Sequence, residues 1–420
     1  MSVALPAHST LAPFRVRSYR FQWHADLAAS WAFEMETIIL GWYILVETQS
    51  VLLLTLFASL QYIGTLAAPM FGVMGHRIGN KRTYCAMRAT YATLAAFMMI
   101  LALTGVLTPL YVFIIATLMG MVRPSDLVLR YALIGESMPA AQLTGAASIS
   151  RTTQDSARVM GALAGAGLVA LLGMGFAYVA ITLFYVGSLL LSLQVSGKPV
   201  VAHPDTTPEI APTSAWRDLK DGVAYVWTTP HLLAAIYLAF LVNLTAFPFT
   251  LGLLPYVAKE IYHTNQTGLG YLVASFAFGA LVGSIALSRI GHTLPSGRMM
   301  VGFCAVWYCM IWLFAQMPVI AGGIPMLMLA GCAQSLALVP MSAMLLRNTG
   351  ESFRGRVMGL RMLMIYGVPV GLMIAGPMIS HFGFRTTATT YCVIGLAFTA
   401  LIGVRWRHHI WRLDAPANKR

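Results

Sequence analysis

The sequence has few charged residues and no polar region large enough to fold as a separate soluble domain. Charged side chains make up 10% of the 420 residues, whereas soluble domains contain about 25%. Hydrophobic residues make up 58%, a composition that predicts a membrane protein. Without a large polar domain, the chain cannot be a pump that carries its own nucleotide-binding domain.

Sequence signatures of catalysis are also missing. The chain contains no H-E-x-x-H zinc motif, no G-x-S-x-G nucleophile motif and no G-x-x-x-x-G-K-[ST] phosphate loop. The five cysteines all fall in apolar segments, and their odd number predicts packing residues rather than a disulfide framework. The 25 methionines are dispersed, which favours packing over a path for a soft metal. We therefore expect no enzyme, no cofactor and no metal site.

Long apolar segments separated by short polar breaks account for most of the chain. Each has about 20 residues, enough to cross a bilayer, and helices satisfy the backbone polar groups of such segments internally. Twelve segments have this character: Phe21–Val46, Val51–Phe71, Thr83–Leu103, Pro109–Ile134, Leu143–Leu172, Gly175–Leu193, Leu232–Val257, Gly268–Leu287, Met299–Met317, Gly323–Leu345, Val357–Ile379 and Thr386–Val404. The predicted fold class is an all-α polytopic membrane protein with twelve transmembrane helices.

Positive charge is concentrated at the chain ends, in the middle segment and in alternate breaks between the spans. The chain carries 27 Lys and Arg against 14 Asp and Glu. By the positive-inside rule, both termini and the middle segment lie in the cytoplasm of a cell-membrane protein. Anionic lipid then accounts for the excess charge, and nucleic acid is not needed as a partner. The first apolar run is too long, and too interrupted by acidic residues, for a cleavable signal.

The middle segment divides the spans into two groups of six. Residues 196–214 are rich in Pro and Thr and polar, as expected of a linker. We predict an N-terminal six-helix bundle at 1–195, a cytoplasmic linker at 196–229 and a C-terminal six-helix bundle at 230–420. Three short matches recur in order about half a chain apart: Arg77-Ile78-Gly79 with Arg289-Ile290-Gly291, Gly135-Glu136-Ser137 with Gly350-Glu351-Ser352, and Gly175-Phe176 with Gly383-Phe384. They predict two pseudo-symmetric halves that bind substrate where they meet.

The stretch GVMGHRIGNKR follows the second span. It resembles the loop motif of the major facilitator superfamily, G-x-x-x-D-R-x-G-R-K-R, through Gly72, Arg77, Gly79, Lys81 and Arg82. The resemblance implies a tight turn whose charges cap neighbouring helix ends and lock one arrangement of the two halves. His76 stands where the family has an aspartate, so the permanent negative charge of that lock is missing.

A longer set of residues resembles one branch of this superfamily, the transmembrane secretion effectors, which include the enterobactin exporter and macrolide efflux proteins. The set consists of Gly120, Arg123, Asp126, Arg130, Ala132, Leu133, Glu136, Pro139, Arg158, Gly161 and the run FRGRVMGL at Phe353–Leu360. The likeness extends over almost the whole chain and implies efflux driven by the proton gradient. Two features of antiporters are absent: the fifth span lacks the proline of G-x-x-x-G-P, and no arginine precedes Gly120 in the fourth span.

Ionisable residues inside the spans gather in the first half. An ionised group at the bilayer centre costs at least about 2.5–3.5 kcal/mol, so such residues face the bundle interior and are usually paired. The seven are Glu34, Glu36, Arg123, Asp126, Arg130, Asp155 and Arg158. Glu34 and Glu36 are separated by roughly 200° around a helix, so at most one points squarely into a cavity.

We expect Glu34 or Glu36 to carry the proton, with Arg123 as a movable partner. The spacings of Asp126 with Arg130 and of Asp155 with Arg158 favour structural pairs. Asp26 lies near the cytoplasmic end of its span, where we expect ordinary solvation.

The second half is expected to supply mostly neutral recognition. The substrate-cavity candidates are Asn243, Trp307, Gln334 and Tyr366. Pro248, Pro255 and Pro369 predict kinks, and the rows Gly161, Gly165 and Gly279, Gly283 predict close helix packing.

Together these features predict a secondary transporter that acts as a monomer in the lipid bilayer on protons and a small-molecule substrate. Proton-coupled efflux of a siderophore-like or drug-like organic molecule is the leading hypothesis. Efflux of a transition metal or metal complex is the second, and uptake of a small metabolite is the third.

Overall fold

The computed structural model describes residues 12–67, 78–196, 215–290, 296–350 and 353–412. Within these ranges the chain forms helices and no strands. Ten helices are long and apolar enough to cross a membrane; one of them, Gly145–Leu193, contains two of the predicted spans, and the shorter apolar helix Val51–Thr65 corresponds to the second. The predicted all-α fold with twelve spans is therefore confirmed.

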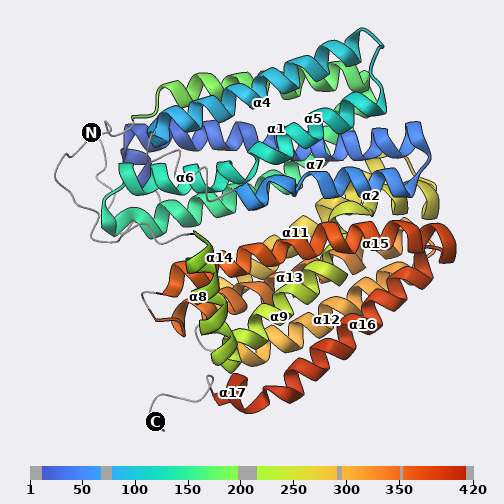
Figure 1. Ribbon diagram of the computed structural model, residues 1–420. Coiled ribbons are helices and arrows are strands. Elements are labelled where there is room, and N and C mark those ends of the chain that lie inside the picture. Colours follow the sequence, from blue (N-terminus) through green and yellow to red (C-terminus); the bar gives the residue numbers. More distant parts are fainter. Residues whose placement is uncertain (1–11, 68–77, 197–214, 291–295, 351–352, 413–420) are drawn as a thin grey trace. The chain divides into compact units, whose positions relative to one another are not determined.

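The helices group into two compact units. The first unit comprises residues 1–49, 60–202 and 265–274. Its main helices are α1 (Arg17–Thr48), α4 (Asn80–Leu103), α5 (Pro109–Val122), α6 (Pro124–Ser137) and α7 (Ala140–Leu193), with the short 3-10 helices η1 (Ala12–Arg15) and η2 (Ile63–Ala67). Helices α1 and α4 both pack along α7, as Figure 1 shows.

The second unit comprises residues 50–59, 203–264 and 275–420. Its helices are most of α2 (Val51–Leu60), α8 (Ala215–Thr228), α9 (Pro230–Thr245), α10 (Leu254–Tyr256), most of α11 (Gln266–Ile290), α12 (Ser296–Gln316), α13 (Ile320–Arg347), α14 (Arg354–Leu363), η6 (Met364–Tyr366), α15 (Gly367–Phe382), α16 (Phe384–Arg405) and α17 (Arg407–Arg412). Two π-helical turns, η3 (Pro248–Gly252) and η4 (Val257–Ile261), follow α9. The irregularity expected at Pro248 is thus present as a π-turn.

Helix α8 lies within the predicted linker and packs on the second unit. The ring of Tyr225 stacks on Phe353, with centroids 4.4 Å apart and planes 10° from parallel. Asp221 Oδ2 lies 3.9 Å from Arg356 Nη1. The end of the linker is therefore attached to the start of α14.

A single glycine turns the chain between the last two spans of each unit. Gly173 interrupts α7 with φ 78° and ψ 172°, and Gly383 separates α15 from α16 with φ 80° and ψ 165°. An L-residue with a side chain rarely adopts such a positive φ. The two halves thus repeat one backbone turn, and the glycine equivalent to Gly383 is Gly173 rather than the Gly175 that the sequence match indicates.

Glycine rows bring the helices close together in both units. A Cβ atom at Gly161 would lie 2.8 Å from the Glu34 Cβ atom, and one at Gly165 would lie 2.8 Å from the Met35 Cα atom. A Cβ atom at Gly279 would overlap the carbonyl of Met328 in the crossing of α11 with α13. The close packing predicted for these rows is confirmed.

Candidate functional site

A cluster of four charged side chains lies inside the first unit; Asp26, Arg88 and Arg130 are buried and the side chain of Asp126 is 25% exposed. Arg88 on α4 lies 2.6 Å from Asp26 on α1 and 2.8 Å from Asp126 on α6. Arg130 on α6 lies 2.7 Å from Asp126 and 3.5 Å from Asp26. Two carboxylates and two guanidinium groups balance, so the cluster, which we call the charge cluster, is neutral overall. Burial of a charge is tolerated when it is paired and hydrogen-bonded in this way.

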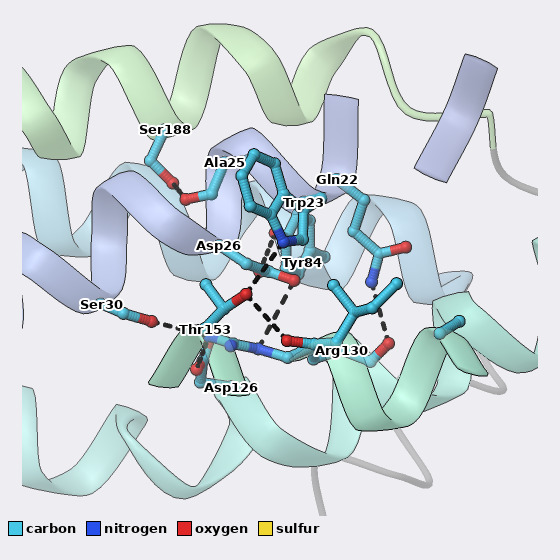
Figure 2. A network of polar contacts seen from close by, with 12 residues as sticks. Gln22, Trp23, Ala25, Asp26, Ser30, Tyr84, Asp126, Arg130, Thr153 and Ser188 are labelled. Carbon is cyan, nitrogen blue, oxygen red and sulfur yellow. Dashed lines mark hydrogen bonds and ion pairs between the residues drawn. The ribbon is translucent and has the colours of Figure 1, made fainter. Parts of the chain in front are cut away.

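Neighbouring polar contacts hold the charge cluster in place, as Figure 2 shows. The hydroxyl of Tyr84 donates to Asp26 Oδ1 at 2.6 Å. Gln22 donates to the backbone carbonyl of Arg130 at 2.9 Å, and Trp23 donates to the hydroxyl of Thr153 at 2.9 Å. Helix α1 is therefore joined to α4, α6 and α7 through polar groups as well as through packing.

The expectation that Asp26 is solvated is wrong. Asp26 is 4% exposed and Arg88 is 1% exposed. Arg88 was absent from the predicted charged residues, although an arginine inside the span Thr83–Leu103 was itself a signal. The predicted pair of Asp126 with Arg130 is present, but it belongs to this larger cluster.

A second group of charges lies on a more accessible face of the first unit. Arg151 Nε lies 3.2 Å from Asp155 Oδ2, so the partner of Asp155 is Arg151 and not the predicted Arg158. Arg158 Nε instead lies 3.5 Å from Glu34 Oε1 on α1. The side chains of Arg151 and Arg158 are 62% and 44% exposed. Charged groups inside a span avoid lipid, so we infer that these two arginines face water, and we call this side of the unit the water-lined face.

Arg123 occupies the junction between α5 and α6. Pro124 starts α6 and provides no backbone N–H group, so the helical hydrogen-bond pattern breaks at Arg123, although its backbone dihedrals remain helical (φ −50°, ψ −42°). A Cβ atom at Gly120 would overlap the carbonyl of Leu60, which shows how closely the chain before η2 approaches α5. This approach brings Gln61 Oε1 to 3.3 Å from Arg123 Nη1.

The guanidinium group of Arg123 lies 3.5 Å from the centroid of the Phe33 ring. Its observed contacts are thus an amide and an aromatic face, whereas Glu34 contacts Arg158. The structure does not bring Arg123 into an ion pair with either Glu34 or Glu36 within the described ranges.

Glu36 is enclosed on the side of α1 opposite to Glu34 and the water-lined face. It is 3% exposed. The hydroxyls of Tyr178 and Tyr185, both on α7, donate to its two carboxyl oxygens at 3.3 and 3.1 Å. Among the described residues Glu36 has no cationic partner, unlike Asp26, Glu34, Asp126 and Asp155 of the same unit. The two tyrosines had no signal in the sequence, because aromatic residues inside spans are common.

The cavity candidates lie in the second unit. Trp307 on α12 is completely buried and meets Phe247 edge to face, with centroids 5.0 Å apart. Its indole N–H has no hydrogen-bond partner among the described residues. Asn243 on α9 donates to the carbonyl of Ala239 at 2.7 Å, and its Cβ atom lies close to Gly367, the residue after Tyr366. Gln334 is half-buried on α13.

Part of the loop motif lies outside the described residues, namely Gly72, His76 and Arg77. Gly79 precedes α4 with φ 101°, a conformation that favours glycine. Lys81 and Arg82 lie in the first turn of α4. The motif therefore contains the glycine-dependent turn that its resemblance implies.

Helices long enough to span a membrane, with charged side chains sheltered inside one unit, define a polytopic α-helical membrane protein. The sequence profile of the Major Facilitator Superfamily matches residues 27–366 and, in a second overlapping match, residues 236–419. The chain belongs to this superfamily. A search of curated proteins found no match.

Solved structures of similar fold include several transporters. A bacterial homologue of the human lysosomal transporter Spinster, in an inward-facing, unoccupied conformation, is 12% identical with a TM-score of 0.73, and the match covers 96% of this chain and 99% of that one. The D-xylose–proton symporter is 11% identical with a TM-score of 0.70, over 91% and 96% of the two chains. The POT family transporter PepTSo is 12% identical with a TM-score of 0.72, over 94% and 98% of the two chains. These likenesses establish the fold, and with the family they make the chain a secondary transporter of the membrane.

Proposed function

We propose that this transporter exports a small organic molecule from the cytoplasm by alternating access and that entry of protons drives the export. The proposal places the protein in the cell membrane with both termini in the cytoplasm. The first unit binds the proton, and the second supplies neutral and aromatic groups such as Asn243 and Trp307 to the substrate. A D-xylose–proton symporter shares the fold, so proton coupling is compatible with it.

One observation supports Glu36 as the proton-binding group: it is a buried carboxyl group, and its hydrogen-bond partners among the described residues are two hydroxyls and no arginine. An isolated charge in such a place is costly, and a bound proton removes that cost without a cation. Asp26, Asp126, Asp155 and Glu34, by contrast, each lie 2.6–3.5 Å from an arginine. We therefore choose Glu36 over Glu34 as the group that gains and loses the proton.

The first experiment compares Glu36→Gln with Glu34→Gln in everted membrane vesicles. A pH-sensitive dye reports the proton gradient while siderophore-like and drug-like compounds are added one at a time. In the unmodified protein, a transported compound accumulates in the vesicles and dissipates the gradient. Glutamine has nearly the shape of a protonated glutamate and accepts no further proton, so Glu36→Gln should abolish substrate-dependent dissipation while Glu34→Gln retains it.

Two outcomes would contradict this proposal. If Glu36→Gln retains coupling and Glu34→Gln loses it, the proton is carried by Glu34. If both variants retain coupling, or if accumulation persists when the gradient is fully collapsed, transport is not driven by protons through this carboxyl pair. The culture medium of a deletion strain, compared with its parent by mass spectrometry, would then identify the exported compound directly.

A further inference from the structure

Arg123 has hydrogen-bonding capacity that the described protein leaves unused. A guanidinium group carries five N–H donors in a rigid planar fork, and the described contacts of Arg123 engage one of them, with Gln61 at 3.3 Å. The flat face of the same group covers Phe33, so the fork is held in a defined plane.

The arginines and carboxylates that form ion pairs in the first unit do not include Arg123. The carboxylates of Asp26 and Asp126 are matched by Arg88 and Arg130 in the charge cluster. On the water-lined face, Glu34 and Asp155 are matched by Arg158 and Arg151. Arg123, by contrast, forms no ion pair with a carboxylate among the described residues.

Arg123 is also close to the water-lined face. Phe33, on which it stacks, directly precedes Glu34 on α1, and Glu34 pairs with the half-exposed Arg158. A solute that reaches Arg158 from water thus has Arg123 and an aromatic ring nearby.

We propose that Arg123 binds an anionic group, of the carboxylate type, on the transported molecule, and that the substrates of this protein are organic anions. The planar fork suits a carboxylate, which it can hold through two parallel hydrogen bonds, and Phe33 orients the fork. The proposal rests on the transport function proposed above and adds the chemical class of its substrate.

An anionic substrate fits export for an electrical reason. The interior of a cell is negative, so outward movement of one negative charge is favoured by a concentration ratio of about 50-fold for each 100 mV. Exchange of one anion for one incoming proton moves two charges in the favoured direction and adds this electrical drive to the pH gradient.

The test measures binding to the purified full-length protein in lipid nanodiscs, without any proton gradient. Three probes share one ring system and differ in charge: 2-naphthoate, its neutral methyl ester, and 2-naphthylmethylammonium. We expect 2-naphthoate to bind about 10- to 100-fold more tightly than the other two, as one charged hydrogen-bonded pair allows. Arg123→Gln should remove this preference, while the affinity for the methyl ester stays within about twofold.

Two further variants keep the result interpretable. Arg151→Gln removes an arginine from the water-lined face that is already paired with Asp155, so the preference for 2-naphthoate should be retained. Arg123→Lys keeps the positive charge but lacks the planar fork. It should therefore show part of the preference for 2-naphthoate that Arg123→Gln loses. 2-Naphthyl phosphate is included as a fourth probe. If it binds more tightly than 2-naphthoate, the site is specific for phosphate esters and the carboxylate assignment is overturned.

The proposal is overturned if the unmodified protein binds none of the probes or shows no preference for the anion, or if Arg151→Gln lowers the preference as much as Arg123→Gln. Failure of the proton-coupling proposal would look different, because Glu36→Gln should leave the preference for 2-naphthoate intact. Loss of coupling and loss of anion binding are thus separate measurements on separate residues.

Discussion

Replacing Arg88 with methionine would remove one of the two positive charges of the charge cluster while keeping an unbranched side chain. Asp26 and Asp126 would then share Arg130, which lies 3.5 Å from the first and 2.7 Å from the second. The cluster would change from neutral to one net negative charge. Arg88 is 1% exposed, so water cannot readily replace the lost guanidinium group.

Breaking a buried ion pair by removing one partner costs about 3–5 kcal/mol, because it leaves an uncompensated buried charge. The entropy of unfolding grows with residue number, so each kcal/mol corresponds to roughly 1 °C in a chain of this length. We therefore expect Arg88→Met to lower the melting temperature by about 3–6 °C. Adding Asp26→Asn removes the excess negative charge and should recover a large part of the loss.

The assay is the melting temperature of the detergent-purified protein, followed by the fluorescence of its tryptophans. Arg151→Met is the matched control, because it makes the same chemical change in a pair whose arginine is 62% exposed. Such exposed pairs contribute about 0–1 kcal/mol, so its melting temperature should change by no more than about 1 °C. Equal shifts in Arg88→Met and Arg151→Met, or a double variant that loses the sum of both single losses, would refute the reasoning.

Two further changes test the packing and the turns. Gly331→Ala should lower stability by about 1–3 kcal/mol, because its Cβ atom would overlap the carbonyl of Phe276. The control is Gly302→Ala, whose Cβ atom meets no atom within 4 Å. Equal melting temperatures for the two variants would contradict the predicted overlap. Gly173→Ala should cost about 1–3 kcal/mol, because φ 78° with ψ 172° is a combination that only glycine adopts readily. The cost is measured as a lower melting temperature, and an unchanged value would show that the turn tolerates a side chain.

The positions of the spans along the chain could be predicted from the sequence, because hydropathy is a local property. Within the described residues, each predicted span overlaps one or more helices, and the glycine rows at Gly161 and Gly279 indicated close crossings that the structure contains. The pair of Asp126 with Arg130 could be predicted because both residues lie one turn apart on the same helix.

The partners that lie on different helices could not be predicted in this way. Helical spacing suggested Arg158 as the partner of Asp155, yet Arg158 reaches Glu34 on α1. Asp26 looked solvated because its distance along the span was considered, whereas Arg88 and Tyr84 on α4 enclose it. Side-chain pairing between helices depends on their rotation about their axes, which hydropathy alone does not determine.

The matching turns at Gly173 and Gly383 limit what engineering of either half can change. A helix pair that reverses direction on one residue with positive φ has no slack in its connection, so inserting or deleting a residue there would rotate one helix by about 100° and move its whole interior face. Side chains on the helices can be exchanged between the halves without this penalty. Exchanging side chains along the helices, rather than residues at the turns, is therefore the practical way to transfer a property from one half to the other.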